Sequence, residues 1–152
     1  MKKILLSAVL SASFLLAEAG VSVGASSGKA LNIDINEVLL SVSYSKDFNK
    51  LYTELSFDFG TGSNSNSYNT NLKVGYLITQ DLVFYGIGSA GYQTLKVDSR
   101  DINSLGFGYG AGVEYRITKS IKTQLEYKTF DMQNNSNSYK YSFSSLNLKY
   151  SF

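Results

Sequence analysis

The sequence contains no cysteine and no histidine. Without them the chain cannot form a Ser-His or Cys-His nucleophile pair, a histidine general base or a usual zinc site. We therefore expect neither enzymatic activity nor a metal or other cofactor. The absence of cysteine also excludes disulfide bonds, so stability must come from packing and from closed backbone hydrogen bonding.

The chain also has little net charge, with 14 Lys and Arg against 12 Asp and Glu. This balance gives no sign of a nucleic-acid-binding protein. Hydrophobic residues make up 43% of the chain, which is too many for a disordered tail. Its 152 residues contain no linker rich in proline, in glycine and serine or in charge, so we expect one folded domain.

The first twenty residues have the pattern of a secretory signal. Lys2 and Lys3 precede an apolar stretch at 4–16, and Ala17, Glu18 and Ala19 give the small-x-small pattern read by signal peptidase. As a helix the stretch would span roughly 20 Å, short of a hydrocarbon core of about 30 Å, which disfavours a membrane anchor. We predict that residues 1–19 are a cleaved signal peptide and residues 20–152 the mature domain.

From Gly20 onward, apolar and polar residues alternate with a period of two. In residues 105–117 every odd position is apolar or aromatic, whereas the even positions hold glycine, glutamate or arginine. A helix cannot separate the two sets, but a strand places them on opposite faces. The same pattern predicts eight strands, near 21–27, 38–45, 51–59, 71–78, 82–92, 105–117, 121–128 and 146–152.

The connections between these strands alternate in length. Residues 47–50, 79–81 and 118–120 are short links, whereas 28–36, 60–69, 94–103 and 131–138 are longer and polar. An up-and-down barrel of the outer membrane has short periplasmic turns and long external loops, and an even strand number places both chain ends on the periplasmic side. We predict an all-β, eight-stranded antiparallel transmembrane barrel.

Alternation alone does not decide whether the apolar face meets lipid or the core of a soluble periplasmic carrier barrel. The signal peptide makes the outer membrane reachable. Aromatic residues near the predicted strand ends also fit the two girdles of a membrane barrel. These residues are Tyr44, Phe59, Tyr76, Tyr115 and Phe152.

The polar face would then line a lumen that side chains can nearly fill. The glycines at 106, 108, 110 and 112 either leave volume for charged chains opposite or merely permit bending. Inward charges are costly unless they are paired, so we predict a bridged network. Its members are Glu54, Lys73, Glu114, Arg116, Lys122, Glu126 and Lys128.

Such a network is either the gate of a pore or a structural plug. The plug is favoured because an eight-stranded lumen leaves little continuous water path. The same alternation places Phe130, Tyr141 and Phe143 on the inner face near the external end. Either they lie above the membrane or a bulge shifts the register there.

Two segments resemble the outer-membrane-protein-A-type barrel family. Residues 110–119 followed by 125–128 are similar to its penultimate hairpin. Residues 145–152 resemble the terminal assembly signal, in which Tyr150 and Phe152 match the aromatic positions and Asn147 stands where glycine is usual.

The resemblance implies insertion in the bacterial outer membrane, contact with its lipid and lipopolysaccharide, and recognition by the barrel-assembly machinery. It also implies a structural role in envelope integrity or an adhesive one, with external loops meeting a host or surface ligand. The alternative is a narrow pore for small solutes or ions. We expect a monomer without a peptidoglycan-binding domain, and the histidines used by lipid A deacylase and palmitoyltransferase barrels are missing.

Overall fold

The computed structural model describes residues 17–97, 100–134 and 138–152, which form one closed β-barrel. Residues 1–16, most of the predicted signal peptide, lie outside the described part. The strands are β1 (Glu18–Ala30), β2 (Ile33–Phe48), β3 (Leu51–Gly62), β4 (Ser65–Leu77), β5 (Leu82–Val97), β6 (Arg100–Arg116), β7 (Ile121–Gln133) and β8 (Ser138–Ser151). In these ranges no helix has the length and hydropathy needed to span a membrane.

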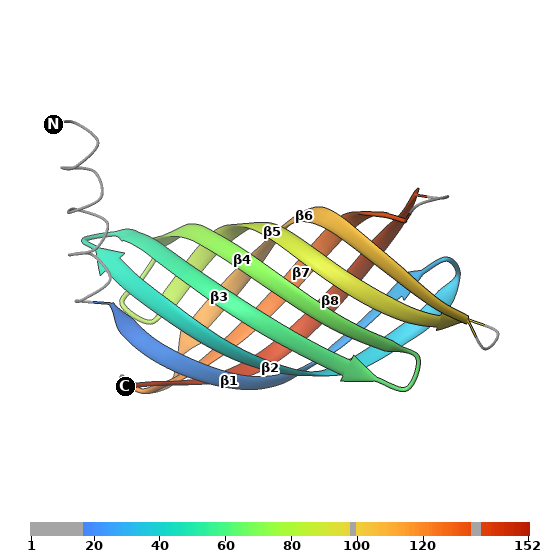
Figure 1. Ribbon diagram of the computed structural model, residues 1–152. Coiled ribbons are helices and arrows are strands. Elements are labelled where there is room, and N and C mark those ends of the chain that lie inside the picture. Colours follow the sequence, from blue (N-terminus) through green and yellow to red (C-terminus); the bar gives the residue numbers. More distant parts are fainter. Residues whose placement is uncertain (1–16, 98–99, 135–137) are drawn as a thin grey trace, which may run out of the picture.

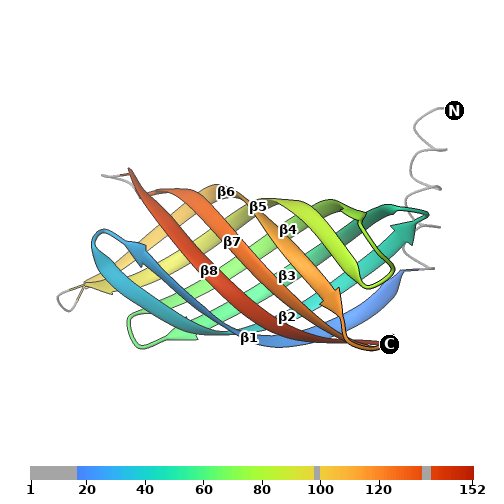
Figure 2. The same cartoon turned by 180° about the vertical axis from the view of Figure 1, so that it is seen from behind.

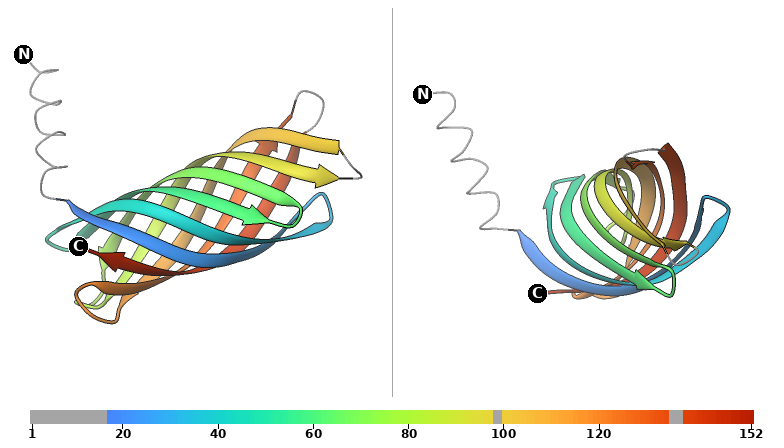
Figure 3. Two further views of the ribbon diagram at one scale, coloured as in Figure 1. Left: turned by 60° about the horizontal axis from the view of Figure 1, so that its bottom comes forward. Right: turned by 45° about the vertical axis from the view of Figure 1, so that its right-hand side comes forward.

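Each strand pairs antiparallel with the next, and β8 pairs with β1 to close the barrel (Figures 1 and 2). This confirms the predicted eight-stranded up-and-down topology. Figure 3 shows β1 and β8 side by side along their length, as their pairing from Gly20 opposite Ser151 to Ala30 opposite Tyr141 requires. A closed barrel leaves no unpaired strand edge.

The alternation of the sequence sorts side chains between the two faces of the barrel wall. On β6, Phe107 is 74% exposed on the outside, whereas Glu114 is fully buried on the inside. Large apolar side chains cover the outer face of every strand. A continuous exposed apolar surface of this kind is suited to lipid and not to water.

The two ends of the barrel differ in what they contain. The terminal end, on the left in Figure 1, holds the start of β1, the end of β8 and the links at 49–50, 78–81 and 117–120. The hairpin end holds the links at 31–32 and 63–64 and the ends of the β5–β6 and β7–β8 pairs. Leu31 and Asn32 both have positive φ angles, of 50° and 64°, as a two-residue type I′ turn requires.

The prediction of long polar loops at the hairpin end is wrong. Strands continue through most of 28–36, 60–69, 94–103 and 131–138, so that Ala30 pairs with Ile33 and Val97 with Arg100. With 12 to 17 residues, the strands are longer than the roughly 9–11 needed to cross a bilayer. The excess extends the barrel wall beyond the apolar band.

Polar pairs between neighbouring strands stabilise this extension on its outer face. Thr61 Oγ1 donates to Asn66 Oδ1 at 2.9 Å, and Thr94 makes the same bond to Asn103 at 2.9 Å. Lys29 lies 3.4 Å from Asp34 across the β1–β2 hairpin. These polar residues make the segments resemble loops in composition. In the strands, each of their side chains has a hydrogen-bond or ion-pair partner on the neighbouring strand.

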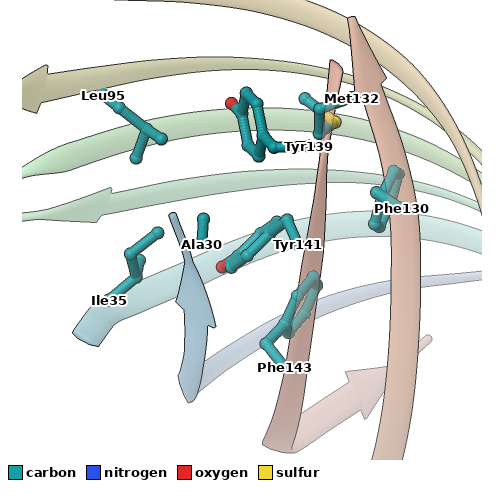
Figure 4. Packing of buried hydrophobic residues seen from close by; sticks show 8 residues of the cluster. All are labelled: Ala30, Ile35, Leu95, Phe130, Met132, Tyr139, Tyr141 and Phe143. Carbon is teal, nitrogen blue, oxygen red and sulfur yellow. The ribbon is translucent and has the colours of Figure 1, made fainter. Parts of the chain in front are cut away.

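Much of the inner face of the extension is apolar, beside a few buried polar side chains such as Glu37 and Gln93. We call its buried apolar residues the hairpin-end cluster, which comprises Ala30, Ile35, Leu95, Phe130, Met132, Tyr139, Tyr141 and Phe143 (Figure 4). The polarity of the wall is therefore inverted here, with polar side chains outside and apolar ones inside, as in a water-soluble barrel.

This inversion accounts for the three aromatic residues that the sequence pattern placed on the inner face. Pairing continues without a bulge from Leu105 opposite Gln133 to Arg116 opposite Lys122, and from Ile121 opposite Tyr150 to Gln133 opposite Ser138. Phe130, Tyr141 and Phe143 therefore do point inward. They belong to the hairpin-end cluster and fill the lumen there.

Two of the four inner glycines of β6 make room for aromatic rings. A Cβ on Gly108 would lie 2.7 Å from the ring of Phe130, and one on Gly112 would lie 2.6 Å from the ring of Tyr85. Only Gly110 of this row faces a charged side chain, that of Lys128. Gly106 meets Met132, so at the other three positions of the row the first of the two predicted uses, room for charged side chains, does not hold.

This packing predicts opposite effects of alanine at two glycines. Gly108→Ala should lower the free energy of unfolding by about 1–3 kcal/mol, because its methyl group overlaps the Phe130 ring. Gly88→Ala, whose Cβ meets nothing within 4 Å, should be neutral or stabilising by about 0.5 kcal/mol. Urea unfolding in lipid vesicles measures both, and equal effects would contradict the packing.

Candidate functional site in the barrel lumen

A row of alternating charges crosses the middle of the lumen. Lys73 Nζ lies 2.8 Å from Glu54 Oε1 and 2.5 Å from Glu126 Oε1. Lys128 Nζ continues the row, at 3.0 Å from Glu126 Oε2 and 3.0 Å from Asp58 Oδ2. At the other end Lys149 pairs with Glu54. Three ammonium groups thus alternate with three carboxylates.

Neutral side chains also donate hydrogen bonds to the carboxylate oxygens of the row. Tyr52 donates its hydroxyl to Glu54 Oε2 at 2.6 Å, and Tyr85 donates to Glu126 Oε1 at 2.9 Å. Asn71 Nδ2 donates to Asp58 Oδ2 at 2.7 Å. Buried charges are tolerated when they are paired and their other lone pairs are hydrogen-bonded, and both conditions hold here.

A second group of charges lies nearer the terminal end. Arg116 Nε donates to Glu114 Oε1 at 3.2 Å, and its two terminal nitrogens donate to the two oxygens of Asp47 at 2.8 and 3.1 Å. Gln124 Nε2 donates to Glu114 Oε2 at 2.9 Å and also faces Glu54 at 3.4 Å. Gln124 therefore links this group to the central row.

The structure brings together six of the seven charged residues predicted from the sequence and sets the seventh apart. Lys122 is buried in the lumen, but its ion pair, at 2.6 Å, is with Glu18. Glu18 belongs to the predicted signal peptide. The list from the sequence also missed Asp58 and Lys149, although the alternation that selected the others places both inward. Glu37, likewise buried, accepts hydrogen bonds from Ser65 and Ser67 at 2.6 and 2.7 Å.

Little open space remains beside the network. The void bounded by Ser22, Ser41, Ser43 and the central row is too narrow for a water molecule. Apolar residues close the lumen on both sides of the central row. The hairpin-end cluster lies towards the hairpin end, and a second cluster lies towards the terminal end, made of Tyr52, Val83, Tyr85 and Ile87. In the described ranges no group of three or more acidic residues is arranged to hold a metal ion.

Comparison with known proteins agrees with this architecture. The family model described as "Outer membrane protein beta-barrel domain" matches residues 6–152. The chain belongs to this outer-membrane β-barrel family. The protein is thus a transmembrane barrel of the bacterial outer membrane, and its apolar outer face meets lipid. No curated protein sequence matches the chain.

Solved structures of other outer-membrane barrels are similar to this barrel. Neisserial surface protein A superposes with a TM-score of 0.62 at 14% identity, covering 90% of this chain and 97% of its own. Ail, the attachment invasion locus protein of Yersinia pestis, in complex with the heparin analogue sucrose octasulfate, gives a TM-score of 0.59 at 16% identity, covering 90% and 97%. At these identities the likeness shows a shared fold.

The outer-membrane barrel carries aromatic side chains at both edges of its lipid-facing band. Phe59, Tyr68 and Tyr92 form a row across β3, β4 and β5, with ring centroids 5.1 and 6.4 Å apart. Tyr150 and Phe152 lie at the terminal end, with centroids 6.2 Å apart. The residues predicted as girdle members, Tyr44, Phe59, Tyr76, Tyr115 and Phe152, are all exposed on the outside.

Proposed function

We propose that the protein is a sealed, non-enzymatic barrel that has a structural role in the outer membrane and presents its hairpin end at the cell surface. The observation that carries this proposal is the filled lumen. A central row of paired charges and two apolar clusters occupy the cross-section, and the void beside the row is too narrow for water. Ions and small solutes have no wide path through such a lumen.

The alternative is a narrow pore in which the charged network is a gate. Replacing Glu126 or Arg116 by glutamine separates the two functions. In a plug, either change leaves conductance in a planar bilayer at the background level and lowers stability. Glu126→Gln takes one of two carboxylates from Lys73 and Lys128, and Arg116→Gln takes the ion-pair partner from buried Glu114. In a gate, the same change raises conductance.

The matched control for Arg116→Gln is Arg100→Gln, because Arg100 is exposed at the hairpin end. It should change neither conductance nor stability. Raised conductance in Glu126→Gln or Arg116→Gln, but not in Arg100→Gln, would replace the plug by the pore.

A role in surface contact is supported by the shape and chemistry of the hairpin end. Its outer face carries hydrogen-bonding side chains on a wall of regular strands. Its charges lie opposite each other in register, as with Lys96 and Asp101 and with Asp131 and Lys140. We therefore propose a contact with a neutral polar partner, and we expect no binding of a polyanion such as the sucrose octasulfate bound to Ail. Saturable binding of that compound would contradict this.

We also propose that Tyr150 and Phe152 form the signal read by the barrel-assembly machinery. Both rings are exposed on the outer face, at 53% and 71%, where a protein partner can reach them before lipid does. Phe152→Ala should reduce the folded, heat-modifiable form in outer membranes several-fold. Refolding of the same variant into detergent should be unchanged, because Phe152 is not buried. An equal loss in both assays would make Phe152 a stability residue.

A further inference from the structure

The ion pair between Lys122 and Glu18 joins the mature barrel to the predicted signal peptide. Glu18 begins β1 opposite Ser45 on the inner face, and its carboxylate reaches Lys122 Nζ on β7 at 2.6 Å. The Lys122 side chain is only 3% exposed, whereas that of Glu18 is 40% exposed at the mouth. The Glu18 carboxylate is thus bound by Lys122, a residue of the predicted mature chain.

Cleavage after Ala19 would remove this anion and leave Lys122 without a replacement. Its cross-strand neighbours are Arg116 and Lys149, both cations. Arg116 is already bound to Asp47 and Glu114, and Lys149 to Glu54. In residues 17–97, 100–134 and 138–152, the ion pair with Glu18 is the only one that Lys122 makes.

Cleavage also adds a positive charge beside the same position. The new α-ammonium group would be on Gly20, which pairs with Ser151 at the terminal end of β8. Ser151 is 1% exposed, and its Oγ has no hydrogen-bond partner in the described part of the chain. Lys122 then lacks the anion it has in the precursor, the α-ammonium adds positive charge at the same end, and the Ser151 hydroxyl is a hydrogen-bond donor there.

We propose that the mature barrel binds a phosphate-type oxyanion at the terminal end of its lumen, in the place that Glu18 occupies in the precursor. Lys122 Nζ, the Gly20 α-ammonium and the Ser151 hydroxyl are its ligands. Two positive charges favour a doubly charged oxyanion over chloride. The site depends on cleavage after Ala19 and is independent of whether the lumen conducts.

Thermal unfolding of the mature protein tests the site. The protein is purified from outer membranes in a phosphate-free detergent, and its intact mass establishes the first residue. Inorganic phosphate is then titrated against sodium chloride at constant ionic strength. The unfolding midpoint should rise and saturate, by on the order of 5 °C when phosphate far exceeds its dissociation constant.

Two variants and one longer chain separate the site from a general salt effect. Lys122→Met should abolish the response and unfold at a higher midpoint than the unmodified protein without phosphate, because it removes an unpaired buried cation. Lys119→Gln, on the exposed link at the same end, should keep the response. A chain that starts at Glu18 should not respond, because its own carboxylate fills the pocket.

Three results would overturn the proposal: a mature mass that still includes Glu18, no saturating response to phosphate, or an equal response in Lys122→Met. Repeating the titration in phospholipid vesicles identifies the natural source of the anion. A site for free phosphate keeps its response there. A site filled by a lipid headgroup responds in detergent alone, and both results support an oxyanion site.

Discussion

Replacing Glu54 by glutamine is expected to lower the free energy of unfolding by about 3–5 kcal/mol. Glu54 is buried and accepts from Lys73, Lys149 and Tyr52. Lys73 keeps Glu126 as a partner in the variant, but among the described residues Lys149 keeps only the hydroxyl of Ser45. The cost is therefore mainly that of leaving one buried ammonium group uncompensated. Urea unfolding of the protein in lipid vesicles measures it.

A double-mutant cycle assigns this cost to the ion pair. Lys149→Met alone should cost less than Glu54→Gln, because Glu54 keeps Lys73. The combination of both changes should recover about 2 kcal/mol of the loss, since neither charge is then left alone. Asp34→Asn, in the exposed pair with Lys29, is the control and should change stability by less than about 0.5 kcal/mol. Purely additive costs would show that Glu54 and Lys149 do not form the buried pair described here.

Replacing Phe130 by alanine is expected to cost about 3–5 kcal/mol, because it empties the middle of the hairpin-end cluster. The ring is 1% exposed, lies over Gly108 and stacks on Phe143 with centroids 6.1 Å apart. The β7 and β8 strands should lose protection first at this end. Amide hydrogen exchange of residues 129–133 measures the local effect.

The control for this change is Phe107→Ala on the neighbouring strand. Phe107 pairs with Asp131 across β6 and β7 but points outward, where it is 74% exposed. Since lipid replaces its contacts, we expect a cost below about 1 kcal/mol. Equal costs at Phe130 and Phe107 would contradict the packing of Phe130 inside the lumen.

Much of the fold could be predicted from the period of the sequence. Strict alternation in residues 105–117 fixes which side chains of β6 face inward, and the structure agrees at every position. The hairpin end was mispredicted because polar and apolar residues exchange faces there. A segment such as 94–103 then reads as a polar loop, although Leu95 points inward and is buried.

Alternation does not predict which inward side chains contact each other inside the lumen. Alternation shows that Glu54 and Lys149 both face inward, but they come from β3 and β8, 95 residues apart. Their contact depends on the stagger of all eight strands around the barrel, which is a property of closure and not of any one strand. The same holds for Tyr85 and Glu126, on strands that are not neighbours.

Cysteine labelling in intact cells tests the sealed lumen most directly, and the absence of native cysteine makes single substitutions unambiguous. Ser145→Cys places a thiol inside the lumen, where the serine is 2% exposed and its Oγ is among the buried atoms without a partner in the described ranges. Ser63→Cys places one on the exposed β3–β4 link, and Lys119→Cys one on the opposite end. We predict that a membrane-impermeant maleimide labels Ser63→Cys in intact cells and Lys119→Cys only after permeabilisation of the outer membrane. Ser145→Cys should be labelled only after heating in detergent. Labelling of Ser145→Cys in intact cells at the rate of Ser63→Cys would show an open lumen and contradict the account.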